Sequence, residues 1–273
     1  MLPSSRRSKP LVIPVKQEEI ALVLGDLHIP FENRRALSLV ERVGKIIQPD
    51  YFFLNGDVTD CWEISRFDKN PRLESEAALR TEISRTKQYL KSLRSKFPTA
   101  KIKWLYGNHE YRWEKYILAN AKPLHGLSGL SLAEQVDAEA LRIDVINSGN
   151  KENSYLFGNL LIGHFDRVHK HSGYTARNLL EDKGISLIQN HTHRGGATYK
   201  RAYDRDLVGY ENFCLCDRNP AYVDHPNWQL GFSVVHRDLN SDFFYVEQHP
   251  IIETETAGEL VYKCFFNGQY LLN

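Results

Sequence analysis

The sequence predicts an α/β fold with a parallel sheet in its first half and more antiparallel strands in its second. Two observations support this prediction. Apolar strand-like runs alternate with amphipathic helical segments over the first 110 residues, an order that places successive strands in parallel. After residue 142 the apolar runs are shorter and separated by turn residues, which is typical of hairpins.

The first half alternates between the two kinds of element. We expect strands and helices in turn at residues 20–25, 33–47, 51–55, 74–97 and 102–106. Apolar side chains recur at helical spacing in the second and fourth of these segments, and Pro49 and Pro98 follow them as stop signals. The strand, helix and strand up to residue 55 therefore imply a right-handed parallel crossover.

The second half is predicted from shorter patterns. Residues 111–140 resemble an inserted helical cap, and Gly126 and Gly129 within it indicate mobility. A helix is expected at 175–183, ended by Gly184. Strands are expected at 142–147, 154–158, 160–163, 185–190, 229–236 and 243–247, with turns at 195, 218–220 and 238–242.

Bulk properties describe a soluble globular chain of ordinary charge. The 273 residues are enough to bury a substantial core, and 35 basic residues against 34 acidic ones give a net charge of +1. This balance does not demand a polyanionic partner. No apolar run is long enough for a membrane span or a signal sequence, so a cytoplasmic protein is expected. Residues 1–18 are expected to form a flexible arm and 19–273 a single domain; oligomeric state has no signature here.

The four cysteines do not form a disulfide pattern. Cys61, Cys214, Cys216 and Cys264 are too few and too irregularly spaced for a framework at this length. Cys214 and Cys216 are separated by one residue, and we expect them on opposite faces of a strand. Buried thiols are the favoured interpretation, and a zinc or redox role is the alternative.

Five apolar runs end in residues that can bind metals. The ends read Gly25-Asp26-Leu27-His28, Gly56-Asp57, Gly107-Asn108-His109-Glu110, Gly163-His164 and His191-Thr192-His193. Binding sites of α/β proteins lie at the carboxyl ends of strands. Two adjacent divalent metals need a bridging carboxylate, neutral imidazoles or amides, and open positions for water and substrate. The candidate ligands that meet this need are Asp26, His28, Asp57, Asn108, His164, His191 and His193.

These five blocks, in this order, resemble the signature of the calcineurin-like metallophosphoesterases. The resemblance implies a β-sandwich flanked by helices, in α/β/β/α layers, and a site with two divalent metals. By position, the first metal would be held by Asp26, His28, Asp57 and His193. The second would be held by Asp57, Asn108, His164 and His191, with Asp57 as the bridge. Segments from Gly173 to Gln229 also look like phage and prophage members of this superfamily.

The resemblance also implies a reaction. A water activated by the metals attacks phosphorus in line, and His109 protonates the departing oxygen. Glu110 would orient the His109 imidazole from the side away from the substrate, as a carboxylate that binds no metal itself. Mn²⁺ is the favoured ion, and Fe, Zn²⁺, Ni²⁺ and Co²⁺ also suit this mixed oxygen and nitrogen ligand set.

The resemblance implies a phosphate ester as the substrate, and its class is predicted from a difference between this sequence and one branch of the family. Relatives of the serine/threonine phosphatase branch carry an arginine after their second aspartate, whereas here Cys61-Trp62-Glu63 follow Asp60. We therefore favour phosphodiesters such as nucleotides or nucleic acid, with a phosphomonoesterase as the alternative. A non-catalytic binding scaffold of the same fold is the third hypothesis.

Other polar and aromatic residues near the blocks are weaker candidates. Asp60 either supports the site from behind the ligands or only caps the following turn. Arg194, Arg112 and Arg66 are adjacent to the blocks and could bind substrate phosphate, although solvated surface arginines explain them as well. The aromatic residues that follow Glu110 either stack a nucleobase or pack beneath the cap; they are Tyr111, Trp113 and Tyr116.

Overall fold

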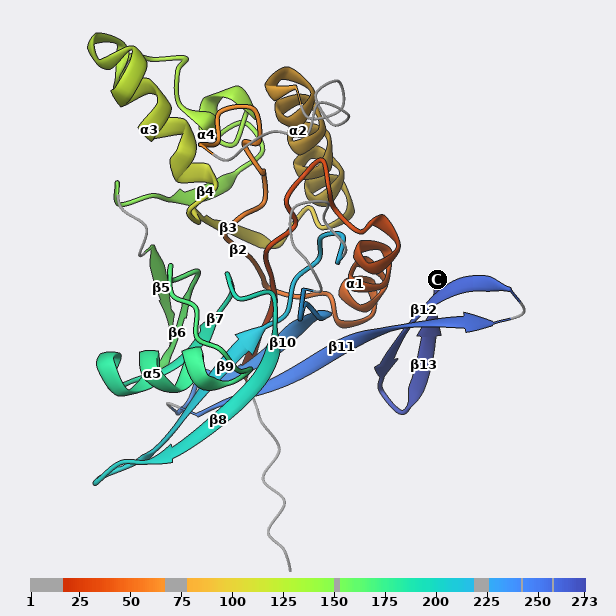
Figure 1. The fold of residues 1–273 in the computed structure, drawn as a ribbon. Helices are drawn as coiled ribbons and strands as arrows, with labels where there is room; N and C mark the ends of the chain where they lie inside the picture. The colour runs from red at the N-terminus through yellow and green to blue at the C-terminus, as the bar shows by residue number, and fades with distance from the viewer. Residues whose placement is uncertain (1–16, 67–77, 150–152, 219–225, 242, 257) are drawn as a thin grey trace, which may run out of the picture.

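Two β-sheets pack face to face, with helices on both outer faces (Figure 1). The computed structural model describes residues 17–66, 78–149, 153–218, 226–241, 243–256 and 258–273. The expected arm at 1–18 therefore lies almost wholly outside the described residues. The helices are α1 (Arg34–Ile47), α2 (Leu79–Lys96), α3 (Glu110–Asn120), the 3-10 turn η2 (Lys122–Leu124), α4 (Leu132–Gln135) and α5 (Tyr174–Lys183).

The larger sheet has eight strands and contains the expected parallel unit. Its order is β13 (Gln269–Leu272), β12 (Glu259–Phe266), β11 (Phe244–Thr256), β10 (Leu230–Asp238), β1 (Glu18–Leu24), β2 (Tyr51–Asn55), β3 (Lys101–Leu105) and β4 (Ile143–Ile146). Strands β1 to β4 run parallel, and β10 to β13 are antiparallel to their neighbours. The first half is thus parallel, as predicted from the alternating strands and helices.

The smaller sheet has five strands from the middle of the chain. Its order is β5 (Ser154–Phe157), β6 (Leu160–Gly163), β7 (Ser186–Gln189), β9 (Asp206–Asn212) and β8 (Gly195–Arg201). Strands β6, β7 and β9 are parallel, whereas β5 and β8 pair antiparallel at the two edges. The second half is therefore mixed, with antiparallel pairs at its edges.

Three apolar cores separate the four layers. Alternate residues of β1 point to opposite faces of the larger sheet: Leu22 and Leu24 join the core under α1 and α2, and Ala21 and Val23 join the core between the sheets. A third core lies between α5 and the smaller sheet, where Leu179 and other side chains are buried. The α/β/β/α layers predicted from the family resemblance are confirmed, and no described helix is long and apolar enough to cross a bilayer.

Two predictions about the second half were wrong or incomplete. Gly195 was expected in a turn, but it begins β8 and pairs with Asn212 of β9; the Phe213 ring packs so closely there that a Cβ would lie 1.8 Å from it. Strands β12 and β13 at the carboxyl end were not predicted. The helical content predicted for 111–140 is present as α3, η2 and α4, and its role as a cap stays a prediction.

Candidate metal centre

The predicted ligands gather where the two sheets meet at the carboxyl ends of their parallel strands. Leu24 of β1 pairs with Leu54 of β2, and Gly163 of β6 pairs with Gln189 of β7, so the polar residues after these strands share one edge. Asn55 joins the sheets, since its Nδ2 donates to the Gly163 carbonyl at 3.0 Å. Both sheets thus supply side chains to one place.

The backbone at these strand ends is strained. Five of the seven candidate ligands have positive φ, between 50° and 77°: Asp26, His28, Asp57, His191 and His193. Non-glycine residues rarely adopt this left-handed conformation, which costs about 1–3 kcal/mol each and is concentrated at functional sites.

One group of ligand atoms surrounds His28. Its Nε2 is 3.1 Å from His193 Nε2, 3.8 Å from Asp57 Oδ2 and 4.0 Å from Asp26 Oδ1. His193 Nε2 is in turn 3.4 Å from Asp26 Oδ1. All four side chains are buried, so their contacts are set by the fold and not by solvent-exposed rotamers.

A second group surrounds His164 and shares Asp57 with the first. His164 Nε2 is 3.2 Å from Asp57 Oδ2 and 3.1 Å from Asn108 Oδ1. Asp57, His164 and His191 together present ligand atoms close enough for one ion. The same oxygen, Asp57 Oδ2, therefore faces His28 on one side and His164 on the other.

This donor set fits a pair of divalent cations. Two ligands about 2.1 Å from one ion, at tetrahedral or octahedral angles, lie about 3.0–3.4 Å apart, close to several of the separations above. Within the described residues, the only basic side chains within 4 Å of the Asp26 or Asp57 carboxylates are histidines. Carboxylate oxygens and neutral imidazole nitrogens are ligands that suit Mn²⁺, Fe and Zn²⁺ alike.

The electrostatics of the cluster lower the pKa of both Asp26 and Asp57; at Asp26, His193 and His164 outweigh the effect of burial. Burial acts to raise the pKa of Asp57, but His109 and His164 outweigh it and hold the pKa well below its usual value. Burial lowers the pKa of His164, yet Asp57 and Asp26 reverse this and raise it to about 10. Burial and His164 lower the pKa of His191 to about 4. The site therefore favours positive charge between ionised carboxylates.

Asp60 contacts two of the site histidines. Its Oδ1 is 3.0 Å from His28 Nδ1 and 2.5 Å from His109 Nδ1, and its carbonyl is 3.0 Å from the same His109 nitrogen. The other nitrogen of His109, Nε2, lies 3.6 Å from Asp57 Oδ2. Burial raises the pKa of Asp60, but His109 and His28 lower it below its usual value. Of the two interpretations of Asp60, support from behind the ligands is the one that these contacts favour.

Glu110 does not contact the His109 ring, contrary to the sequence prediction. Its carboxylate accepts backbone N–H groups of Asp57, Val58 and Gly107, at 2.9, 2.6 and 2.8 Å. The carboxylate next to the His109 ring is that of Asp60, while that of Glu110 is directed to the main chain. Burial, with Asp57 beside it, raises the pKa of Glu110 to about 7.

The three candidate arginines differ in their relation to the site. Arg112 Nη1 donates to the Asp60 carbonyl at 2.9 Å, and its Nη2 is 2.9 Å from His109 Nε2. Arg194 donates instead to the His169 carbonyl at 2.6 Å. Arg66 is exposed at the edge of the undescribed segment 67–77, and no contact within the described residues connects it to the cluster. The structure thus brings Arg112 to the site.

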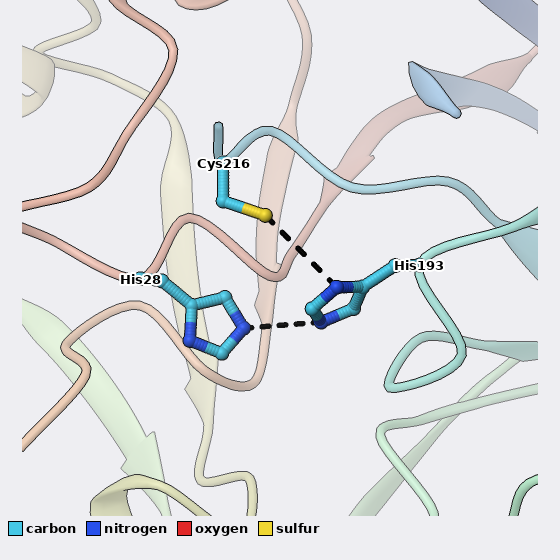
Figure 2. Close-up of side chains that lie close together, drawn as sticks. All are labelled: His28, His193 and Cys216. Atoms are coloured by element: carbon cyan, nitrogen blue, oxygen red, sulfur yellow. Dashed lines mark hydrogen bonds between the residues drawn. The ribbon is translucent and has the colours of Figure 1, made fainter. Parts of the chain in front are cut away.

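Several residues in the site were not selected from the sequence. Asn190 precedes His191, where the motif that this block resembles usually opens with glycine; its Nδ2 donates to Asp26 Oδ2 at 2.9 Å, and its Oδ1 accepts from Asn55. Asp166 Oδ1 lies 3.2 Å from His191 Nε2. Cys216 Sγ lies 4.0 Å from His193 Nδ1 (Figure 2). The departure from glycine at 190 was the one available signal, since asparagine can bond where glycine cannot.

Comparison with known proteins agrees with this geometry. A model of the "Calcineurin-like phosphoesterase" family matches residues 21–224. The "Gene 54 protein" of Mycobacterium phage L5 is 29% identical over 229 residues, which cover 78% of this chain and 87% of that protein.

Solved structures with similar folds include Vps29 from two organisms. Vps29 of Chaetomium thermophilum has a TM-score of 0.43 and 13% identity, covering 93% of this chain and 96% of that one. Vacuolar Protein Sorting 29 of Cryptosporidium parvum has a TM-score of 0.41 and 11% identity, covering 94% and 96%. The family match extends over most of the chain and over every strand end that carries a candidate ligand, so the chain belongs to the calcineurin-like phosphoesterase family.

Proposed function

We propose that this protein is a phosphoesterase that depends on two divalent cations. The observation that carries the proposal is the position of Asp57 Oδ2 between His28 and His164, because one carboxylate oxygen facing two ligand groups is what a shared ligand requires. The first ion would be held by Asp26, His28, Asp57 and His193, and the second by Asp57, Asn108, His164 and His191. Mn²⁺ is the ion that we favour.

The side chains around this pair have separate tasks. Divalent ions in such a site supply Lewis acidity, which activates water and neutralises charge on phosphoryl oxygens. With its Nδ1–H held by Asp60, His109 in its imidazolium form would give the proton on Nε2 to the leaving oxygen and remain as the neutral ring. Arg112 would bind a phosphoryl oxygen, which is a stronger acceptor for a guanidinium than the His109 ring nitrogen that it contacts in this structure.

A phosphodiester is the substrate class that the surroundings favour. The two residues after Asp60 are Cys61 and Trp62, which are buried, so these two positions supply no cationic side chain for a phosphoryl oxygen. Arg112 is the single guanidinium in contact with the cluster among the described residues, which suits the one negative charge of a diester better than the two of a monoester. Trp113 donates to the Leu130 carbonyl at 2.7 Å, so packing, and not base stacking, accounts for it.

The test is hydrolysis by the Mn²⁺-loaded protein. We expect a higher kcat/KM for bis-p-nitrophenyl phosphate than for p-nitrophenyl phosphate. Asp57→Asn should lose bound metal and turnover together, while Asp144→Asn, which changes an exposed aspartate paired with Lys103, should match the unmodified protein. Preference for the monoester would favour a phosphomonoesterase. Two bound ions without turnover of either ester would favour a binding scaffold.

A further inference from the structure

Cys216 approaches the side of the His193 ring that faces away from the ligand cluster. Its Sγ is 4.0 Å from His193 Nδ1, while His193 Nε2 faces His28 and Asp26. Figure 2 shows Cys216 and His28 approaching different nitrogens of this one ring. We propose that the Cys216 sulfur accepts a hydrogen bond from His193 Nδ1–H and so presents the Nε2 lone pair to the first cation. This inference rests on the proposed two-metal site.

The other histidines show why a partner is needed at this position. A ligating imidazole donates its second N–H to an acceptor, which fixes the tautomer and the ring orientation. His28 Nδ1 has the Asp60 carboxylate at 3.0 Å, and His164 Nδ1 has the Asn55 carbonyl at 3.0 Å. For His193 Nδ1, the polar partner within the described residues is the Cys216 sulfur. A thiol therefore occupies the place that a carboxylate or a carbonyl occupies behind the other rings.

The backbone holds the thiol where it is. Leu215 N donates to the Asp26 carbonyl at 3.1 Å, and Asp217 N donates to the Phe31 carbonyl at 2.8 Å. Cys216 itself forms a bridge with Glu32 in the same loop. The residues on both sides of Cys216 are thus bonded to the loop that carries the first candidate ligands, so the sulfur and the ligands are positioned together.

The His193 loop is anchored to the same segment. Gln229 N donates to the His193 carbonyl at 2.9 Å, and Cys214 N donates to the Gln229 carbonyl at 3.0 Å. His193 and Cys216 are 7% and 2% exposed, which leaves little access for water to replace the sulfur as the acceptor. The expectation that Cys214 and Cys216 point to opposite faces of a strand was wrong, because residues two apart in an extended segment share a face, and both cysteines lie in isolated bridges after β9 ends at Asn212.

Co²⁺ binding to the full chain tests this role. Removing an acceptor behind a metal ligand costs about 10–100-fold in affinity, so Cys216→Ala should weaken binding of one of two Co²⁺ ions by that factor. Cys216→Ser keeps an acceptor and should restore most of the affinity. Cys264→Ala, which removes a buried thiol of β12, is the matched control and should bind as the unmodified protein does. The unmodified Co²⁺ protein should lack a sulfur-to-cobalt charge-transfer band in the near ultraviolet.

A measurement on the unmodified protein keeps the test independent of variant folding. Ring ¹⁵N NMR of the Zn²⁺-loaded protein should show His193 as the Nδ1–H tautomer. A charge-transfer band that disappears in Cys216→Ser would instead make the sulfur a metal ligand, and unchanged affinity in folded Cys216→Ala would remove the positioning role. Either result overturns this inference while leaving the two-metal proposal intact. Failure of the unmodified protein to bind any Co²⁺ would overturn both.

Discussion

Asp57 combines more constraints than any other residue of the candidate site. It is 1% exposed, has a φ of 51°, and directs Oδ2 toward three histidine rings while Oδ1 accepts His109 N at 2.9 Å. Space for this carboxylate depends on Gly107, where a Cβ would lie 2.2 Å from Asp57 Oδ1. The glycines that precede the ligands are therefore required for steric reasons. Because this requirement fixes them in the motifs, the motifs could be recognised from the sequence alone.

Roles behind the ligands were harder to predict at this scale. The position of Glu110 next to His109 in sequence made it the expected partner of that ring, but Asp60, 49 residues away, makes the contact. Sequence proximity is a poor guide here because α3 begins at Glu110, and this start turns the carboxylate toward the backbone after β2. Contacts between separate strand ends are set by the sheet, which no local pattern describes.

Variants of His109 and Asp60 should slow turnover without removing the metals. General acid catalysis contributes about 10²–10⁴-fold, so His109→Ala should lower kcat for a dinucleotide, whose leaving group is an alkoxide, by that order. The loss should be much smaller for bis-p-nitrophenyl phosphate, because nitrophenolate departs without a proton. Asp60→Asn should give an intermediate loss, since an amide holds both rings less strongly than a carboxylate does. Steady-state kinetics with metal analysis measures each effect.

His171→Ala provides the control for that comparison. This histidine is exposed and contacts the Tyr174 ring, so both ester substrates should be hydrolysed at unmodified rates. Equal losses for the two leaving groups in His109→Ala would contradict a role in protonation, and loss of a bound ion would make His109 a ligand.

Elements with clear periodicity were predicted well, and those with two apolar faces were not. Helix α1 follows the expected helix closely because Asn33 caps its first turn and its apolar stripe is regular. In β12, by contrast, Cys264 is buried while the neighbouring Phe265 is exposed, so hydrophobicity does not alternate. The Asn267-Gly268 pair after it has positive φ at both residues, which is the signal of a two-residue hairpin and was the available evidence for β12 and β13.

Helix α2 carries a buried carboxylate that makes stability depend on pH. Glu82 is fully buried, and its Oε1 accepts Trp62 N at 2.9 Å. Burial, with Asp60 nearby, raises its pKa from 4.5 to about 9. The protonated form is the one favoured in the fold, so its contribution is complete below pH 4.5 and is lost as the pH rises toward about 9.

Replacing the Glu82 carboxylate should make the stability of the protein depend less on pH. Glu82→Gln keeps an acceptor for Trp62 N and removes the titration, so its melting temperature should fall less between pH 5 and 9 than that of the unmodified protein. Thermal unfolding of chelated samples across this range measures the difference. Glu139→Gln, a change of an exposed glutamate, should leave the pH dependence unaltered. Parallel curves for Glu82→Gln and the unmodified chain would show that Glu82 is ionised in the fold.

At the scale of the molecule, the candidate site lies on the seam between two sheets. Asp26 and Asp57 follow strands of the larger sheet, and His164 and His191 follow strands of the smaller one. The order of the motifs made it possible to predict that these residues belong together. It could not show that Asn190 and Asn55 bond across the seam, because that contact depends on how one sheet packs over the other.

Removal of the metals should therefore weaken the whole molecule and not only its activity. Ions that bind residues of both sheets bind only the folded state and therefore stabilise it. One such site contributes about 2.7 kcal/mol when the free ion concentration is 100 times the Kd of the site. For a chain of this size about 1 kcal/mol corresponds to about 2–4 °C, so chelation should lower the melting temperature by about 5–10 °C for each ion removed. Adding Mn²⁺ back should restore it, as followed by differential scanning fluorimetry. The melting temperature of Asp57→Asn should not change on chelation. If the melting temperature of the unmodified protein changed with neither chelator nor Mn²⁺, this result would contradict ions that bridge the two sheets.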